Sequence, residues 1–188
     1  LYDLPNLVIG PALATLFASF LRMALALKQS ERSFAAESLA KIDDLTGLPN
    51  RRRFVSEVDS YQDGSILLMD LDGFKPVNDN YGHETGDEVL KQVSNRFLKA
   101  IPDSSLLARL GGDEFAVLTH EGYESAMELA MALRATLSYP FKVADNQINL
   151  DVSVGCVAND GRQDILARAD TAMYQAKKSK VGVWAGGT

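Results

Sequence analysis

The sequence predicts an α+β fold in which a central sheet of about five strands is flanked by helices. Two observations lead to this prediction. Segments with helical spacing of apolar residues alternate along the chain with short strand-like runs rich in Val, Ile, Leu and Phe. Two of those runs are separated by a Gly-Gly pair at 111–112. This pair predicts an antiparallel hairpin, because glycine accepts the positive φ angles of a tight turn.

The individual elements follow from the spacing of apolar side chains along the chain. Helices are predicted at 50–61, for a short stretch after residue 75, and at 84–100, 124–137 and 164–179. In the first of these helices, Phe54, Val55 and Val58 are expected to point inward. Strands are predicted at 65–69, on both sides of the Gly-Gly pair, at 147–156, and at 181–184 as an edge strand. Cys156 lies in the alternating run of 147–156 and is expected to be buried.

Composition limits the classes of function. The chain has 188 residues, of which 46% are hydrophobic, and this suffices for one domain with a core plus an extension. A net charge of −6 argues against general nucleic-acid binding. A single cysteine allows no disulfide within the chain, which is typical of a cytoplasmic domain.

The chain divides into an N-terminal segment at 1–40 and a domain at 41–188. Residues 4–21 carry no charge, and Arg22, Lys28 and Arg32 follow them. One interpretation is the end of a membrane span with the domain on the cytoplasmic side. The other is a helix whose apolar face packs on a second copy, which would leave the protein fully cytoplasmic. Residues 23–42 are amphipathic and are expected to form a connecting helix that pairs between protomers.

Four acidic residues point to a phosphate site that uses a metal ion. Asp113 and Glu114 lie at the predicted hairpin turn, and Asp70 and Asp72 follow a buried-type strand. Adjacent carboxylates repel each other, and a bound divalent cation such as Mg²⁺ would offset that repulsion. The hairpin alone is equally compatible with a solvated acidic turn. After Asp72 comes Lys75, which can neutralise phosphate. Asn78 and Asp87 follow, and their side chains can form hydrogen bonds with the edge of a base.

Three motifs contain these residues. They are Asp44-Leu-Thr-Gly-Leu-Pro-Asn-Arg51, Asp70-x-Asp72-x-Phe74-Lys75-x-x-Asn78-Asp79-x-x-Gly82-His83-x-x-Gly86-Asp87-x-x-Leu90, and Gly111-Gly-Asp-Glu-Phe115. From about residue 41 to residue 184, the chain therefore resembles the GGDEF diguanylate cyclases. The resemblance implies a fold akin to nucleotide cyclases and polymerase palms. It also implies the condensation of two GTP into cyclic dimeric GMP (c-di-GMP) and two pyrophosphates, in bacterial second-messenger signalling.

The resemblance also implies the metal site and the assembly. Each domain holds one GTP, so the active species is expected to be a homodimer. Asp70, Asp113 and the Leu71 carbonyl are expected to bind two Mg²⁺ per GTP site, with Mn²⁺ as an alternative. Glu114 is expected to be the proton acceptor or a second metal ligand, and Asp113 could share the role of base. If the N-terminal segment spans a membrane, the domain would be tethered to the bacterial inner membrane.

The remaining substrate contacts are also implied by the resemblance. Lys75 is expected to stabilise charge on phosphate in the transition state. Asn78 and Asp87 are expected to read guanine. Four further residues are expected at the substrate: His83 near the nucleotide loop, Lys177 on the terminal phosphates, Phe74 and Gly112. Asp72 is expected to be structural, and Arg109 to contact phosphate or to brace the hairpin. Asp44 and Arg51 are expected to fix how the N-terminal helix joins the domain.

Two positions depart from the family pattern. Val181 stands where relatives usually carry an arginine, so one phosphate contact is absent or has moved to Lys180. Pro102 and Ser105 stand where many relatives carry the arginine and aspartate of a product-inhibition site, so no such site is expected. The departure at Val181 keeps a second function open. In that alternative, the domain is catalytically silent, binds GTP and regulates an attached module.

Overall fold

The computed structural model describes residues 13–28, 41–60 and 63–186. The chain forms two compact units, Leu1–Ala40 and Lys41–Thr188. In the first unit, residues 13–28 form a helix. Its large apolar side chains are exposed: Leu13, Leu16, Phe17, Phe20, Leu21, Met23, Leu25 and Leu27.

The N-terminal predictions are only partly covered by these residues. Within the described ranges, no helix is both long and apolar enough to cross a membrane. Residues 4–12 of the uncharged segment lie outside the described residues, as do residues 29–40 of the expected connecting helix.

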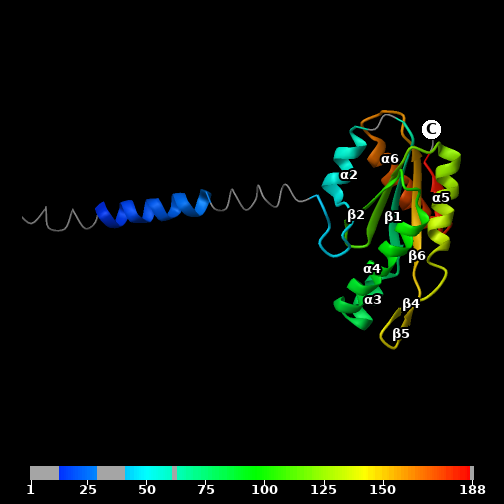
Figure 1. The fold of residues 1–188 in the computed structure, drawn as a ribbon, viewed down its shortest axis with the longest axis horizontal. Coiled ribbons are helices and arrows are strands. Elements are labelled where there is room, and N and C mark those ends of the chain that lie inside the picture. The colour runs from blue at the N-terminus through cyan, green and yellow to red at the C-terminus, as the bar shows by residue number, and fades with distance from the viewer. Residues whose placement is uncertain (1–12, 29–40, 61–62, 187–188) are drawn as a thin grey trace, which may run out of the picture. The chain divides into compact units, whose positions relative to one another are not determined.

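The second unit is built on a five-stranded sheet with the strand order β2-β3-β1-β6-β7 (Figure 1). The strands are β1 (Ser65–Asp72), β2 (Leu106–Gly111), β3 (Glu114–Thr119), β6 (Asp151–Ala158) and β7 (Val183–Ala185). Neighbouring strands run antiparallel, except for the β6–β7 pair, which is parallel. The predicted α+β fold with about five strands is therefore confirmed, and β7 is the predicted edge strand.

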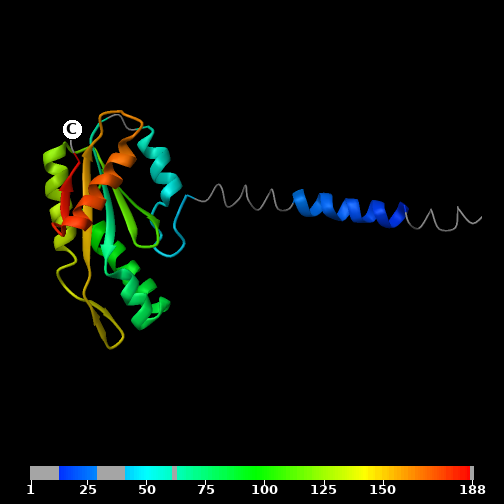
Figure 2. The same ribbon diagram turned by 180° about the vertical axis from the view of Figure 1, so that it is seen from behind.

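Helices cover both faces of the sheet (Figure 2). On one face, α4 (His83–Ala100) and α5 (Tyr123–Ala135) bury their apolar sides in one core cluster. On the other face, α2 (Arg51–Val58) and α6 (Ile165–Ser179) do so in a second cluster. In α2, Phe54 and Val58 are buried as predicted, whereas Val55 is half-buried. Cys156 is fully buried as predicted, and burial raises the pKa of its thiol to about 12.

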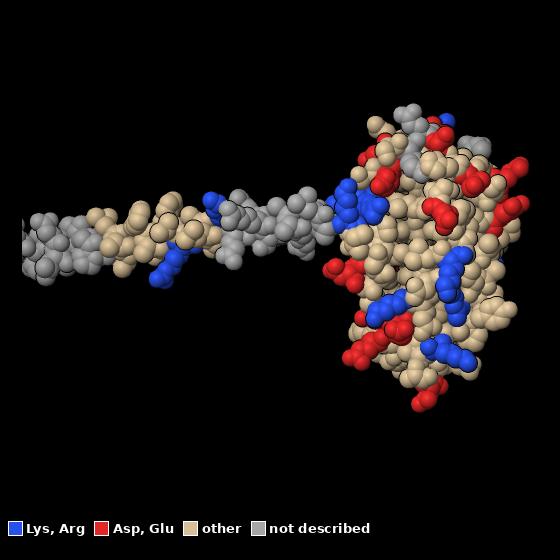
Figure 3. Space-filling model, in the orientation of Figure 1, with Lys and Arg blue, Asp and Glu red and all other residues tan. Residues whose placement is uncertain are grey.

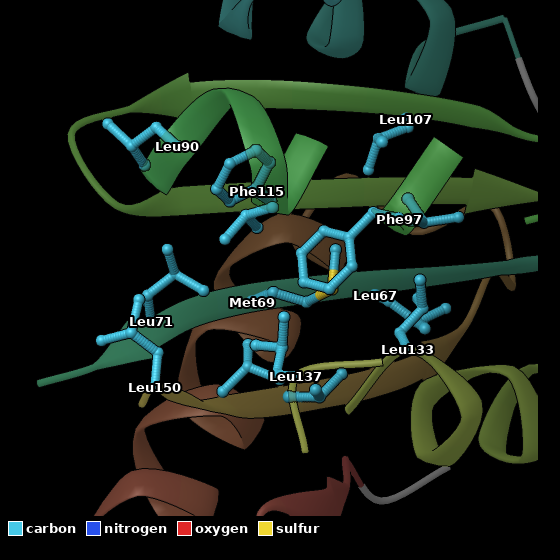
Figure 4. Close-up of a cluster of buried hydrophobic side chains, with 14 of the residues drawn as sticks. Leu67, Met69, Leu71, Leu90, Phe97, Leu107, Phe115, Leu133, Leu137 and Leu150 are labelled. Carbon is cyan, nitrogen blue, oxygen red and sulfur yellow. The ribbon is translucent and has the colours of Figure 1, made fainter. Parts of the chain in front are cut away.

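Strand β1 supplies side chains to both cores, because successive side chains of a strand point to opposite faces. Three of them enter the core drawn in Figure 4: Leu67, Met69 and Leu71. In this core, the rings of Phe97 and Phe115 meet edge to face, with centroids 5.5 Å apart. Ile66 and Leu68 belong to the opposite core. Asp70 therefore lies on the same face of β1 as Ile66 and Leu68. It is near the end of a strand whose register is fixed by the burial of its side chains.

Two predicted strands have different bounds in the structure. The strand predicted to end at residue 69 continues to Asp72, so both of its acidic residues lie on β1. The predicted strand 147–156 is two strands, because β5 (Asn146–Ile148) pairs with β4 (Phe141–Val143) in a separate hairpin. The alternation of apolar residues continues through both strands, so it could not indicate where the pairing partner changes.

Candidate active site

The three acidic residues predicted to hold metal meet where β1 and β3 pair. Asp70 on β1 lies opposite Glu114, the first residue of β3. Asp113 is in the turn, and its backbone carbonyl accepts a hydrogen bond from the Leu71 amide at 3.2 Å. The tight turn and the antiparallel register therefore place three acidic residues at the same end of the β1–β3 pair.

The electrostatics of this group favour a positive partner. Burial raises the pKa of Asp113 above its ordinary value, and the charge of Asp70 raises it further. Two carboxylates in such proximity repel each other unless a cation lies between or beside them. In this structure, the cation is a lysine. Lys177 of α6 donates a hydrogen bond from Nζ to Asp70 Oδ1 at 2.6 Å.

The expected contact of Lys177 with the terminal phosphates of a nucleotide stays a prediction. The hydrogen bond to Asp70, with smaller effects of Asp70, Asp72 and Asp113 as charges, raises the pKa of Lys177. Asp72 has a separate partner, because Ser153 Oγ donates to its Oδ2 at 2.8 Å. That bond ties β1 to β6.

The oxygen atoms of these acidic residues suit a hard divalent cation whose remaining ligands come from the substrate. Among the described residues, no three acidic, histidine or cysteine side chains converge closely enough to hold a metal ion by themselves. Mg²⁺ is usually held by one or two carboxylates together with phosphate oxygens, so such a cage is not required. Asp70, Asp113 and the Leu71 carbonyl could provide those protein ligands.

The hairpin turn is braced by one arginine. Arg109 donates from Nε and Nη2 to the Gly112 carbonyl at 3.0 and 2.8 Å. Its Nη1 donates to Asp43 Oδ1 at 3.0 Å. Of the two roles expected for Arg109, the structure therefore shows the brace. The contact also holds the Gly-Gly turn to the segment that enters the domain.

The residue that anchors this entry segment is Asp43 rather than Asp44. Asp43 Oδ1 accepts hydrogen bonds from the backbone N and the Oγ1 of Thr46, at 2.9 and 2.6 Å. Burial acts against ionisation, but the bonds from Thr46 and Arg109 hold the pKa of Asp43 below its ordinary value. Asp44 is exposed. An Asp three residues before a Thr is a usable signal of such a turn, and the sequence reasoning missed it.

Arg51 lies near these acidic residues as well, beside Glu114. Its Nη2 is 3.7 Å from Glu114 Oε2, and both side chains are substantially exposed. It starts α2, whose first three residues are arginines, and Lys and Arg side chains gather over this helix in Figure 3. The expected role of Arg51 in joining the N-terminal helix to the domain stays a prediction.

The predicted base-reading residues form a second group on α3 (Phe74–Tyr81) and α4. Asn78 lies against Gly86, because a Cβ added at Gly86 would come within 1.9 Å of Asn78 Oδ1. Asp87 follows Gly86 and is exposed, as is His83 at the start of α4. Asn78 and Asp87 therefore flank the turn between the two helices.

Gly73 alone separates the carboxylate strand from the helix that carries Lys75. It caps α3 with a φ of 84°, a conformation that favours glycine. Phe74 is buried beneath the helix, and Lys75 is exposed. The two groups of site residues are thus joined through the end of β1, with Lys75 between them in sequence.

Val181 lies just beyond α6, beside Arg134, whose role the sequence pattern did not indicate. Arg134 of α5 donates from Nη1 to the Val181 carbonyl at 3.4 Å. It also forms a two-point contact with Asp151, at 2.9 and 2.7 Å. These residues help to line a cavity of about 600 Å³ between α5 and β6. Val181 itself carries no charge, so the missing arginine is not replaced at that position.

The family model "Diguanylate cyclase, GGDEF domain" matches residues 40–182. The response regulator PleD of Caulobacter vibrioides is 38% identical over 157 residues, covering 75% of this chain and 35% of PleD. The cyclic di-GMP phosphodiesterase PdeR of Escherichia coli K12 is 37% identical over 155 residues, covering 77% of this chain and 23% of PdeR. The chain thus spans well under two thirds of either relative.

Solved structures show the same fold. The GGDEF domain of TpbB (YfiN) from Pseudomonas aeruginosa matches with a TM-score of 0.73 and 31% identity, over 78% of this chain and 94% of that one. The GGDEF domain of DgcB from Caulobacter crescentus, solved in complex with c-di-GMP, matches with a TM-score of 0.72 and 28% identity, over 78% and 96%. Since the family model covers most of the chain and a relative is 38% identical over 75% of it, the chain belongs to the family of GGDEF-domain diguanylate cyclases.

Proposed function

We propose that this chain is the catalytic domain of a diguanylate cyclase, which condenses two GTP into c-di-GMP and releases two pyrophosphates. The observation that carries the proposal is the meeting of Asp70, Asp113 and Glu114 at the β1–β3 end, beside the cationic Lys177. Acidic residues that can bind metal ions, together with a lysine, can stabilise the charge that develops in phosphoryl transfer.

Each residue has a role in the proposed reaction. The 3′-hydroxyl of one GTP attacks the α-phosphate of the other, and the bond from that phosphate to pyrophosphate breaks. Glu114 accepts the hydroxyl proton, with Asp113 as the neighbouring carboxylate. Lys75, exposed on α3, stabilises the charge that develops on phosphate. Lys177 binds the terminal phosphates once the nucleotide has entered.

The other group of residues selects the base. Asp87 accepts hydrogen bonds from the N1–H and the exocyclic amine of guanine, which adenine cannot match. Asn78 completes the base contacts, His83 lies near the nucleotide loop, and Phe74 and Gly112 shape the site around the phosphates. Two Mg²⁺ or Mn²⁺ ions per site, held by Asp70, Asp113 and the Leu71 carbonyl, would polarise the α-phosphate and neutralise the leaving group.

One domain holds one GTP, so the proposed reaction needs two domains that face each other about a two-fold axis. A homodimer is therefore part of the proposal. A cytoplasmic location is also part of it, supported by the single buried cysteine, which allows no disulfide within the chain.

A second candidate is a silent domain that binds GTP and regulates an attached module. It is favoured by one specific observation: a relative at 37% identity is named as a cyclic di-GMP phosphodiesterase, and this chain spans only 23% of that protein.

Incubation of the protein with GTP and Mg²⁺, followed by chromatography of the products, separates the two candidates. We expect c-di-GMP and pyrophosphate from GTP and no product from ATP. Asp113→Asn and Glu114→Gln should each lower the rate by about 100-fold or more. Tight GTP binding without any product would favour the silent domain, and failure to bind GTP would contradict both candidates.

A further inference from the structure

The ion pair between Lys177 and Asp70 has a consequence for the order of binding. Lys177 Nζ lies 2.6 Å from Asp70 Oδ1. The Asp70 side chain is 15% exposed and the Lys177 side chain is 49% exposed. The carboxylate is therefore held in place by its strand, whereas the ammonium is at the end of a flexible stem that reaches in from solvent.

Lys177 is hydrogen-bonded to Asp70 and also lies within the electrostatic influence of two neighbouring aspartates. The charges of Asp70, Asp72 and Asp113 all act on its ammonium. Asp72 already accepts a hydrogen bond from Ser153, and Asp113 is in the turn, where its backbone carbonyl accepts from the Leu71 amide. The lysine thus serves as the counter-ion at the point where a divalent cation would bind.

An ammonium and a divalent cation cannot both use Asp70 Oδ1 without repulsion. A Mg²⁺ ion lies about 2.1 Å from its oxygen ligands, so the two positive centres would be less than about 5 Å apart. The cation must therefore displace the lysine, or the lysine must find another partner first. A nucleotide triphosphate provides that partner, because its terminal oxygens attract the ammonium at least as strongly as one carboxylate does.

We propose that Lys177 is an internal counter-ion that keeps the cation site closed until a nucleotide draws the lysine away, so that divalent cation and nucleotide bind cooperatively. This inference rests on the proposed function for the identity of the nucleotide. Its first half, competition between Lys177 and a cation for Asp70, does not depend on turnover. Coupling of this kind is reciprocal, so the cation also raises the affinity for the nucleotide.

The test measures Mn²⁺ binding by electron paramagnetic resonance with the full 188-residue chain and no nucleotide. Lys177→Met should bind Mn²⁺ more tightly than the unchanged protein, by on the order of tenfold. Lys178→Met is the matched control, because it removes the same charge from the next, exposed residue of α6. It should change Mn²⁺ affinity by less than about twofold, since an exposed charge contributes little. Equal affinities in the two variants would overturn the proposal.

Two further arms sharpen the result. Adding Asp70→Asn to Lys177→Met should abolish the gain in Mn²⁺ affinity, and a gain that persists would show that Asp70 is not the contested ligand. A GTP analogue with a non-reactive α,β-methylene bridge should raise Mn²⁺ affinity more in the unchanged protein than in Lys177→Met. An equal rise in both would overturn the cooperative half. Because no arm requires turnover, absence of c-di-GMP in the product assay would count against the cyclase alone.

Discussion

At the scale of single residues, the site depends on a few positions where another side chain would break a contact or cause a clash. Gly86 is buried on α4, and the side-chain oxygen of Asn78 occupies the space that a Cβ would need. The positioning of Asn78, a predicted base reader on α3, therefore depends on the absence of a side chain at Gly86 on the neighbouring α4. Asp43 is a second such position, since its carboxylate joins Thr46 to Arg109.

Gly86→Ala should destabilise the domain by about 1–3 kcal/mol, although alanine normally favours a helix interior. The clash with Asn78 is the reason, so the same substitution in an Asn78→Ala background should cost clearly less. Denaturant unfolding of the four proteins in this cycle measures both effects. An equal cost in the two backgrounds would show that Asn78 is not the obstacle.

The pH dependence of stability should report on Asp43. Its pKa is lowered in the folded protein, so its contribution is present above the unfolded value of about 3.9 and is lost as the pH falls below that value. Asp43→Asn should therefore lower the melting temperature at pH 7, and the difference from the unchanged protein should shrink below about pH 4. Asp44→Asn, at the exposed neighbour, should show no such trend. A difference for Asp43→Asn that stays constant down to pH 3 would contradict this assignment.

At the scale of elements, the hairpin and the entry segment act as one braced unit. The guanidinium of Arg109 binds the Gly112 carbonyl and Asp43 at once, which a lysine ammonium cannot do in the same geometry. The position of Asp113 and Glu114 thus depends on a contact made well outside the turn.

Arg109→Lys should leave the domain folded but misplace the turn. We expect kcat to fall by about 10- to 100-fold with a smaller change in KM, because orientation of the reacting groups is lost. Arg53→Lys, in an exposed pair with Glu57, is the control and should leave both constants near their original values. The assignment would be wrong if Arg109→Lys kept full kcat.

The segment before the hairpin bears on feedback by product. Ser105 uses its hydroxyl inside the fold, donating to Thr119 Oγ1 at 3.0 Å, and its amide donates to the Pro102 carbonyl at 2.9 Å. Neither residue offers a charge to a cyclic dinucleotide. Added c-di-GMP should therefore inhibit weakly, and only in competition with GTP, in a progress-curve assay. Strong noncompetitive inhibition at low micromolar product would show that another surface supplies the anchors.

At the scale of the whole molecule, the two units are expected to have different roles in a dimer: the first pairs with a second copy, and the second carries the site residues. The helix at 13–28 carries exposed apolar side chains, which suits a surface that pairs with a second copy. The domain at 41–188 carries both groups of site residues. Pairing of the first unit would then raise the local concentration of the second.

The specific activity of a chain with residues 41–188 alone should rise with protein concentration, because the catalytic state is a dimer. The full chain should keep its activity at lower concentrations, since pairing of the N-terminal segments raises the effective concentration of the domains. Assays across a dilution series, with sedimentation at the same concentrations, check both statements. Full, concentration-independent activity from a monomer would falsify the two-domain mechanism.

The sequence by itself determined most of the fold and the identity of the acidic site. Apolar periodicity and the Gly-Gly pair are local signals, so they predicted the helices, the hairpin and the burial of Cys156. The hairpin turn also implied that Asp113 and Glu114 lie together. Local signals failed to separate β5 from β6, because two strands in succession and one long strand have the same alternation.

Only the tertiary structure decided the contacts between distant segments. Lys177 and Asp70 are 107 residues apart, and Arg109 and Asp43 are 66 apart. No spacing rule links such pairs, because their meeting depends on how α6 and the entry segment pack against the sheet. The sequence therefore predicted which residues could serve a phosphate site. Packing decided that the Lys177 ammonium lies on the Asp70 carboxylate and that the Arg109 guanidinium braces the turn.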